Sequence, residues 1–246
     1  RNRNQINFII VTMKTQILKI TTSLLFLVLL VGCQEKQTEQ KAEPTDNQES
    51  KEVAMADDTE VAATTKGYGI GDAAAAINLK NVDGTMVSYD DYPDAKGFIV
   101  IFTCNTCPFA VASEDRIIAL DQKYKPKGYP VIAINPNDPE VQPDDTFELM
   151  QQKAKDKGFT FPYLYDTSNT VYATYGATKT PHVYLLQKED DQRIVKYIGA
   201  IDDNVRNGDA VKNQFLANAI DQLLAGKEVS VTETKAIGCS IKQKKA

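Results

Sequence analysis

Two cysteines separated by two residues are the part of this sequence best suited to chemistry. Cys104 and Cys107 follow an apolar run at residues 97–102, and Pro108 comes directly after the second cysteine. A thiolate is the reactive form of cysteine, and the free N–H groups at a helix N-terminus stabilise it. Proline suits the first helical turn, where no N–H donor is needed. The pattern therefore predicts a thiol pair at a strand-to-helix junction.

A thiol pair in this position predicts disulfide exchange. Cys104, the outer sulfur, is expected to attack a disulfide, and Cys107, further into the helix, is expected to resolve the mixed disulfide. The alternatives are a structural disulfide and half of a metal site. The place of the C-x-x-C pattern between a strand and a helix favours the redox interpretation. No organic cofactor and no obligatory metal are expected.

Three further positions are candidates for the same site. Thr180-Pro181 precedes a predicted strand, although X-Pro bonds are common there for purely structural reasons. His182, when protonated, would raise the thiolate content of a nearby dithiol, or it would join both sulfurs around copper. A histidine at a strand start more often packs or meets solvent. Cys239 is either a third exchanging thiol or an inert cysteine of a C-terminal extension, and the inert cysteine is the preferred interpretation.

Apolar patterns predict the elements that must position these residues. A hairpin is expected at 77–80 and 85–88, buried strands at 97–102 and 130–135, and a terminal antiparallel pair at 182–186 and 193–199. Helices are expected at 109–124, 144–157, 168–175 and 209–225. Strands that alternate with helices, followed by two adjacent strands and a helix, predict a three-layer α/β/α sandwich with a central mixed sheet.

The first 66 residues are expected to lie outside this domain. Residues 1–32 combine a basic start with a short apolar stretch, which is typical of a secretory signal. The segment from Leu30 to Cys33 resembles the bacterial lipobox, whose cysteine is lipid-modified; the alternative is an uncleaved N-terminal anchor. Residues 33–66 are mostly polar or alanine, with nine acidic residues against four lysines and almost no large apolar residue, which predicts a disordered tether. The globular domain is then 67–246, and the true start is expected at Met13.

Composition excludes some classes of function. The formal net charge of −5 leaves no basic footprint for nucleic acid. Four cysteines and one histidine provide few ligands for a zinc site built from those residues.

Seven stretches of residues 67–246 match one known family. They are Gly71-Asp72, Val82-Asp83-Gly84, the segment from Phe102 to Phe109, the segment from Ala133 to Asp138, the segment from Tyr163 to Asp166, Thr180-Pro181, and the segment from Gly238 to Lys242. Together they resemble the thioredoxin-like redoxins of the AhpC/TSA superfamily, in particular bacterial thioredoxin-family proteins with a Cys-Asn-x-Cys-Pro motif. The resemblance implies a thioredoxin-like fold, a redox pair at Cys104 and Cys107, and a cis-proline at Pro181. It also implies that Thr180 presents its backbone to an extended substrate.

The sequence lacks the characteristic motifs of two related groups, the ordinary thioredoxins and the peroxiredoxins. The Trp-Cys-Gly-Pro-Cys of ordinary thioredoxins is absent, and the inner residues that tune thiol pKa are Asn105-Thr106 instead. The Pro-x-x-x-Thr-x-x-Cys signature of peroxiredoxins is also absent, because Ile101 and Gly97 stand at its Thr and Pro positions before Cys104. This argues against efficient peroxide reduction.

Taken together, the sequence predicts an exported, lipid-anchored thiol–disulfide oxidoreductase with its domain in the periplasm or at the cell surface. The expected partners are disulfide-bearing proteins, a membrane-side thiol reductant and the membrane itself through the lipid on Cys33, with no nucleic acid. The alternatives are a peroxiredoxin-like antioxidant peroxidase, and a copper-binding or copper-chaperone domain that uses the dithiol with His182. The direction of exchange stays open, because it depends on the reduction potential and the partner.

Overall fold

The structure, a computed structural model, describes residues 67–244 of the chain. The predicted signal segment, the lipidation site at Cys33 and the tether at 33–66 lie outside the described residues. Within residues 67–244, no helix combines the length and the apolar character needed to cross a membrane.

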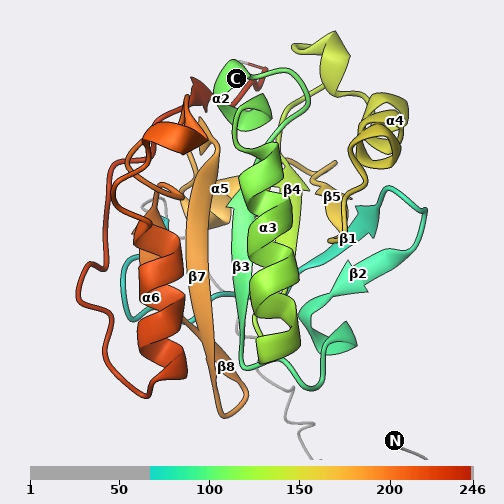
Figure 1. The fold of residues 1–246 in the computed structure, drawn as a ribbon. Helices are drawn as coiled ribbons and strands as arrows, with labels where there is room; N and C mark the ends of the chain where they lie inside the picture. Colours follow the sequence, from blue (N-terminus) through green and yellow to red (C-terminus); the bar gives the residue numbers. More distant parts are fainter. Residues whose placement is uncertain (1–66, 245–246) are drawn as a thin grey trace, which may run out of the picture. The chain divides into compact units, whose positions relative to one another are not determined.

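A seven-stranded mixed sheet forms the middle layer (Figure 1), and its strand order is β2-β1-β5-β4-β3-β7-β8. The three central strands β3, β4 and β5 are parallel to one another. The strands that flank them, β1 and β7, run antiparallel to them. The strands are β1 (Asn78–Asn81), β2 (Met86–Ser88), β3 (Gly97–Phe102), β4 (Val131–Asn135), β5 (Tyr163–Tyr165), β7 (His182–Glu189) and β8 (Gln192–Gly199). A separate two-stranded sheet pairs β6 (Lys179–Thr180) with β9 (Cys239–Ser240).

Helices cover both faces of the seven-stranded sheet, with α3 and α6 in front of it in Figure 1 and α5 behind it. The α-helices are α2 (Pro108–Val111), α3 (Glu114–Tyr124), α4 (Phe147–Lys157), α5 (Val171–Tyr175) and α6 (Phe215–Leu224). Short 3-10 helices span Tyr89–Asp91, Lys125–Lys127, Pro143–Asp145 and Gly208–Ala210. The predicted three-layer α/β/α sandwich with a central mixed sheet is therefore confirmed.

The core consists of two apolar layers, because side chains alternate across each strand. Ile99 and Ile101 of β3 face α3, α4 and α6, whereas Phe98, Val100 and Phe102 face the layer that contains α5. Every residue of β3 and β4 is buried, as expected for the central parallel strands of a sheet covered on both faces.

One predicted helix, at 109–124, is interrupted in the structure. It divides into α2 and α3 at Ala112-Ser113. The Ser113 hydroxyl donates to the carbonyl of Phe109 at 2.8 Å, and a hydroxyl that bonds four residues back tends to bend a helix. Arg116 donates to the carbonyl of Ala112 at 3.0 Å, which satisfies a carbonyl that the interruption leaves free.

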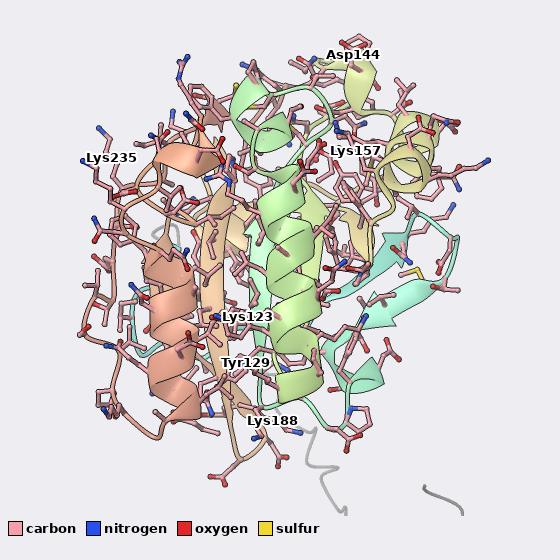
Figure 2. The ribbon with its side chains drawn as sticks, in the orientation of Figure 1. Lys123, Tyr129, Asp144, Lys157, Lys188 and Lys235 are labelled. Carbon is pink, nitrogen blue, oxygen red and sulfur yellow. The ribbon has the colours of Figure 1, made fainter. Side chains whose placement is uncertain are left out.

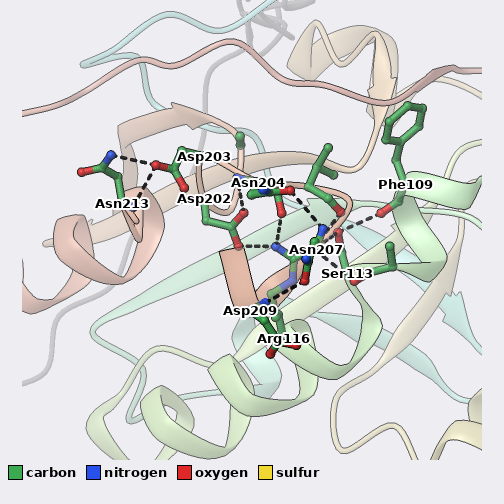
Figure 3. Close-up of polar contacts among 12 residues, drawn as sticks. Phe109, Ser113, Arg116, Asp202, Asp203, Asn204, Asn207, Asp209 and Asn213 are labelled. Atoms are coloured by element: carbon green, nitrogen blue, oxygen red, sulfur yellow. Dashed lines mark hydrogen bonds and ion pairs between the residues drawn. The ribbon is translucent and has the colours of Figure 1, made fainter. Parts of the chain in front are cut away.

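The arginine at this interruption also ties α3 to a distant loop (Figure 3). Arg116 donates to the carboxylate of Asp202 at 2.5 Å and to the carbonyls of Asn204 and Val205 at 2.9 and 2.8 Å. The last helix begins at Phe215 rather than at 209 as predicted. The reason is that Asp203 accepts hydrogen bonds from the N–H groups of residues 212 and 213 at 2.9 and 3.0 Å, which holds that stretch as a loop.

Candidate active site: three thiols beside a cis-proline

The dithiol lies at the end of the domain where β3 passes into α2. Cys107 immediately precedes α2, and Pro108 is the first helical residue. Asp144 lies at this same end, and Lys188 lies at the opposite end (Figure 2). Cys104 and Cys107 are only 3% and 5% exposed, and both are free thiols. Two buried free thiols therefore lie at the carboxyl end of β3.

The dithiol contacts the residue that precedes Pro181. Cys104 Sγ lies 3.2 Å from Thr180 Oγ1, and the Cys107 thiol donates to the Thr180 carbonyl at 3.2 Å. The Thr180–Pro181 peptide bond is cis, the isomer that the family resemblance implies. Residues more than 70 positions apart in the sequence thus form one site.

Asn105 anchors the loop that carries both sulfurs. Its side-chain amide donates to the Asp144 carbonyl at 2.9 Å, and its side-chain oxygen accepts from the Tyr163 hydroxyl at 3.0 Å. Lys153 donates to the Asn105 carbonyl at 2.5 Å and pairs with Glu114 at 2.6 Å. Asn105 is therefore a buried structural residue, whereas Thr106, its neighbour in the motif, is exposed.

A buried carboxylate, Asp145, also holds this loop through a hydrogen bond. It is fully buried and accepts from the Asn105 N–H at 2.6 Å and from the Asn137 side chain at 2.6 Å. Its negative charge also acts on Cys104, whose pKa it helps to raise. Sequence reasoning missed Asp145, which it placed in the first turn of the predicted helix at 144–157, whereas in the structure Asp145 ends a 3-10 helix and α4 begins at Phe147.

The pKa values of the two thiols are shifted in opposite directions. The pKa of Cys107 is lowered to about 4, chiefly by a hydrogen bond from the Cys104 thiol, and also by hydrogen bonds from Cys239 and from the Ala110 N–H. The pKa of Cys104 is raised, first by that same hydrogen bond and then by burial. The hydrogen bond from the Cys107 thiol to the Thr180 carbonyl opposes ionisation of Cys107. The hydrogen bonds from Cys104, Cys239 and Ala110 act in the other direction.

Because the two thiols titrate as a pair, their shared hydrogen bond lets the pair lose one proton readily, and the expectation that Cys104, the outer sulfur, is the attacking group stays a prediction. The physical reason for the unequal shifts is local. Helix α2 has only four residues, so discrete hydrogen bonds rather than a helix dipole set the acidity. These bonds converge on Cys107, whereas Cys104 lies beside the charge of Asp145.

Cys239 joins this group from the far end of the chain. In the β6–β9 pair it lies opposite Thr180, and it packs against the cluster formed by Cys104, Cys107 and Ala110. The pKa of the Cys239 thiol is raised to about 11, first by burial and then by its hydrogen bond to Cys107. The structure therefore brings all three candidate cysteines of the domain together.

His182, by contrast, takes no part in this group in the described residues. Its Nδ1 accepts from the Thr178 N–H at 3.3 Å, and its ring packs on Tyr184 at 4.9 Å between centroids. Burial lowers the pKa of His182 to about 4, so the ring is neutral at neutral pH. Among residues 67–244, no group of three or more His, Cys, Asp or Glu side chains is arranged to hold a metal ion.

A cavity of about 520 Å³ lies elsewhere, between α3 and residues 201–217. It is lined by residues such as Ala112, Leu120 and Val211, and none of the three cysteines borders it. The reactive groups, not the cavity, therefore define the candidate site.

Comparisons with known proteins find chains of similar sequence and fold. The chain is similar to an uncharacterised conserved protein from Geobacillus kaustophilus, with 36% identity over 72% of this chain and 94% of that one and a TM-score of 0.67. It is also similar to a hypothetical protein from Sinorhizobium meliloti 1021, with 34% identity over 74% of this chain and 98% of that one and a TM-score of 0.68. Proteins with curated functions include no significant match.

The family model described as AhpC/TSA family matches residues 70–198, which is more than half of the 246 residues and includes the dithiol and the cis-proline. The fold and the match both agree with the resemblance noted in the sequence. The chain therefore belongs to the AhpC/TSA family, within the superfamily of thioredoxin-like redoxins.

Proposed function

We propose that this protein is a thiol–disulfide oxidoreductase that exchanges disulfides with protein substrates through Cys104 and Cys107. One observation carries the proposal: two free, mutually hydrogen-bonded thiols are held against Thr180, next to the cis peptide bond. Membership of the AhpC/TSA family supports redox chemistry in general, and the hydrogen bond between the two thiols supports the loss of one proton from the pair at neutral pH.

The chemistry follows from the positions of the two sulfurs. The Cys104 thiolate attacks one sulfur of a substrate disulfide, a new S–S bond forms, and the other substrate sulfur leaves as a thiolate. Cys107 then gives up its proton and attacks Cys104, which releases the second substrate thiol. The substrate is reduced by two electrons, and Cys104 and Cys107 are left as a disulfide. An external thiol reductant restores the pair, and the reverse sequence oxidises a substrate.

A redox titration of the full chain in glutathione buffers tests the proposal. We expect a reversible two-electron transition that disappears in Cys107→Ser. A potential near thioredoxin's, about −270 mV, would identify a reductant, and one near about −120 mV an oxidant. Failure of the pair to form a reversible disulfide contradicts the proposal.

Two parallel assays separate the alternatives. Insulin reduction should proceed with a thiol reductant present, and hydrogen peroxide should be consumed no faster than by the Cys107→Ser control. Fast peroxide consumption would instead establish a peroxidase. Tight copper binding by the reduced chain without disulfide exchange would overturn the oxidoreductase in favour of a copper-binding domain.

The proposed location is outside the cytoplasm, on a lipid anchor at Cys33, with disulfide-bearing proteins and a membrane-side thiol reductant as partners. The basic and apolar start and the lipobox-like segment support this part of the proposal. Metabolic labelling with a fatty acid should mark the wild-type chain and not Cys33→Ser. Equal labelling of both chains, or of neither, contradicts it.

A further inference from the structure

The chain's own C-terminal segment covers the dithiol. We call residues 238–244 the C-terminal strap. Its strand β9 pairs with β6 in an antiparallel register, with Cys239 opposite Thr180. Beyond β9, the N–H and the carbonyl of Lys242 bond to Asn137 and Asp138 at 2.8 and 2.9 Å. The strap is thus fastened on two sides of the site.

Gly238 allows the strap to lie this close to the cis peptide bond. A Cβ atom at position 238 would lie 2.2 Å from the Thr180 carbonyl oxygen and 3.1 Å from the Pro181 nitrogen. Both are backbone atoms that cannot rotate away. Any residue larger than glycine would therefore push the strap, and Cys239 with it, off the dithiol.

The position of Cys239 is specific to one of the two sulfurs. Cys239 packs against the cluster that holds both sulfurs, and it acts on the pKa of Cys107 through its thiol and its backbone but not on the pKa of Cys104. Cys107 is therefore the sulfur of the pair that Cys239 approaches. Exchange requires this approach, since the attacked sulfur stands between the attacking and the leaving one.

The three thiols also differ in their exposure to solvent. Cys104 and Cys107 are 3% and 5% exposed, whereas Cys239 is only half-buried. In addition, β9 already occupies the edge of β6 at Thr180, where an extended substrate would have to pair. A large disulfide-bearing protein therefore meets Cys239 before it meets the pair.

We propose that Cys239 is a third exchanging thiol, which forms a disulfide with Cys107 and so carries the oxidised state of the buried Cys104–Cys107 pair to the surface of the protein. This inference rests on the proposed thiol–disulfide exchange at that pair. It reverses the preference for an inert Cys239 that the sequence suggested.

The step is an internal isomerisation and needs no external oxidant. The Cys239 sulfur, after losing its proton, attacks Cys107 of the Cys104–Cys107 disulfide. The Cys107–Cys239 bond forms as the Cys104–Cys107 bond breaks, and Cys104 leaves as a thiolate that takes up a proton. One disulfide and one thiol are present before and after the step.

The acidity of Cys239 changes in the direction that this step needs. Its pKa is raised by burial, then by its hydrogen bond to Cys107 and by the Cys107 charge. The last two effects are lost once Cys107 is part of a disulfide, whereas the lowering effects of Lys242 and Lys179 remain. Cys239 therefore becomes more acidic when the pair is oxidised.

Trypsin makes the proposed bond directly measurable. Cleavage after lysine and arginine releases peptide 97–116, which holds both Cys104 and Cys107, and peptide 236–242, which holds Cys239. A Cys104–Cys107 disulfide stays within one peptide, whereas a Cys107–Cys239 disulfide joins two. The full chain is oxidised with glutathione disulfide, alkylated, digested and analysed by mass spectrometry.

Matched cysteine variants give the decisive comparison. Cys104→Ser should yield at least about tenfold more linked peptide than Cys107→Ser, because Cys107 is the sulfur of the pair that Cys239 approaches. Equal linkage in the two variants overturns the inference. If the wild type still forms the Cys104–Cys107 disulfide, the proposed function stands in that case. If the wild type forms no disulfide at all, the proposed function itself fails.

A glycine variant tests the role of the strap. Gly238→Ala in the Cys104→Ser background should lower the linked peptide several-fold, and Ser240→Ala should leave it unchanged. Formation of the Cys104–Cys107 disulfide by Gly238→Ala alone checks that the variant is folded. Undiminished linkage in folded Gly238→Ala contradicts the proposed placement.

Discussion

At the scale of single residues, the site depends on where hydrogen bonds converge. Cys107 accepts them from Cys104, from Cys239 and from the Ala110 N–H, and each favours the charged sulfur. Cys104 instead faces the hydroxyl of Thr180 on one side and the charge of Asp145 on the other. The same two-residue spacing thus places the two thiols in unequal surroundings.

The first prediction concerns the source of this acidity. In Cys104→Ala the pKa of Cys107 should rise from about 4, because its largest stabilising hydrogen bond is removed. In the matched variant Cys239→Ala the pKa should rise less, because the Cys239 thiol is a smaller contributor. The ultraviolet absorbance of the thiolate, followed against pH, measures both. A larger rise in Cys239→Ala than in Cys104→Ala would contradict this ranking.

The second prediction concerns His182, whose pKa of about 4 lies below the unfolded value of 6.5. As pH falls below about 6.5, His182 becomes protonated in the unfolded chain but stays neutral in the folded chain. The free energy of unfolding therefore falls with pH until about pH 4, where the folded chain also binds the proton. We expect a loss of about 2–4 kcal/mol across this window. Urea unfolding at several pH values should show it as a difference between wild type and His182→Gln. Identical pH profiles for the two proteins would show that His182 ionises freely in the folded state.

At the scale of elements, much of the sandwich could be predicted from local patterns. The buried runs of β3 and β4, the hairpin of β1 and β2, and the pair β7–β8 all appear where period-two or continuous apolar patterns place them. The α2–α3 interruption was not predictable from periodicity, because the apolar spacing continues through it. Its cause, the Ser113 hydroxyl and the Arg116 guanidinium, is a matter of side-chain hydrogen bonds.

Local sequence patterns likewise could not predict the hydrogen bonds that hold the loop carrying the two thiols. Asn105 meets Tyr163 and Asp144, which come from two other segments of the chain. The sequence identified Cys104 and Cys107 because their spacing carries the signal within four residues. It could not identify Asp145, whose partners are brought together only by the folded sheet.

The third prediction concerns the connection between α3 and the loop at 202–209. Arg116→Met leaves Asp202, whose side chain is 4% exposed, without its cationic partner. An unpaired buried carboxylate is costly, and we expect a loss of about 2–4 kcal/mol. Arg116→Lys keeps the charge but not the forked geometry, and it should lose about half as much. Urea unfolding provides both values, and an equal loss in the two variants would show that the forked geometry, and not the charge, carries the stabilisation.

At the scale of the whole molecule, the last residues of the chain complete a site that begins at residue 104. The pairing of β9 with β6 joins segments about 60 residues apart, and β9 is only two residues long. No periodicity marks such a short strand, so the sequence could not place Cys239. The close approach at Gly238, by contrast, is a backbone requirement that becomes visible only against Thr180 and Pro181.

The fourth prediction separates the strap as a cover from Cys239 as a thiol. A chain that ends at Lys235 loses both, so Cys107, which is 5% exposed under the strap, should react with a bulky maleimide at least about tenfold faster. Cys239→Ser keeps the cover and loses only the thiol, so maleimide should reach Cys107 as slowly as in the wild type. Exchange with a large protein disulfide should respond differently: it should be slow in Cys239→Ser, where the cover remains without its exposed sulfur, and faster in the shortened chain. If Cys107 is equally reactive toward maleimide in all three proteins, the strap does not shield the dithiol, and substrates reach Cys107 without passing Cys239.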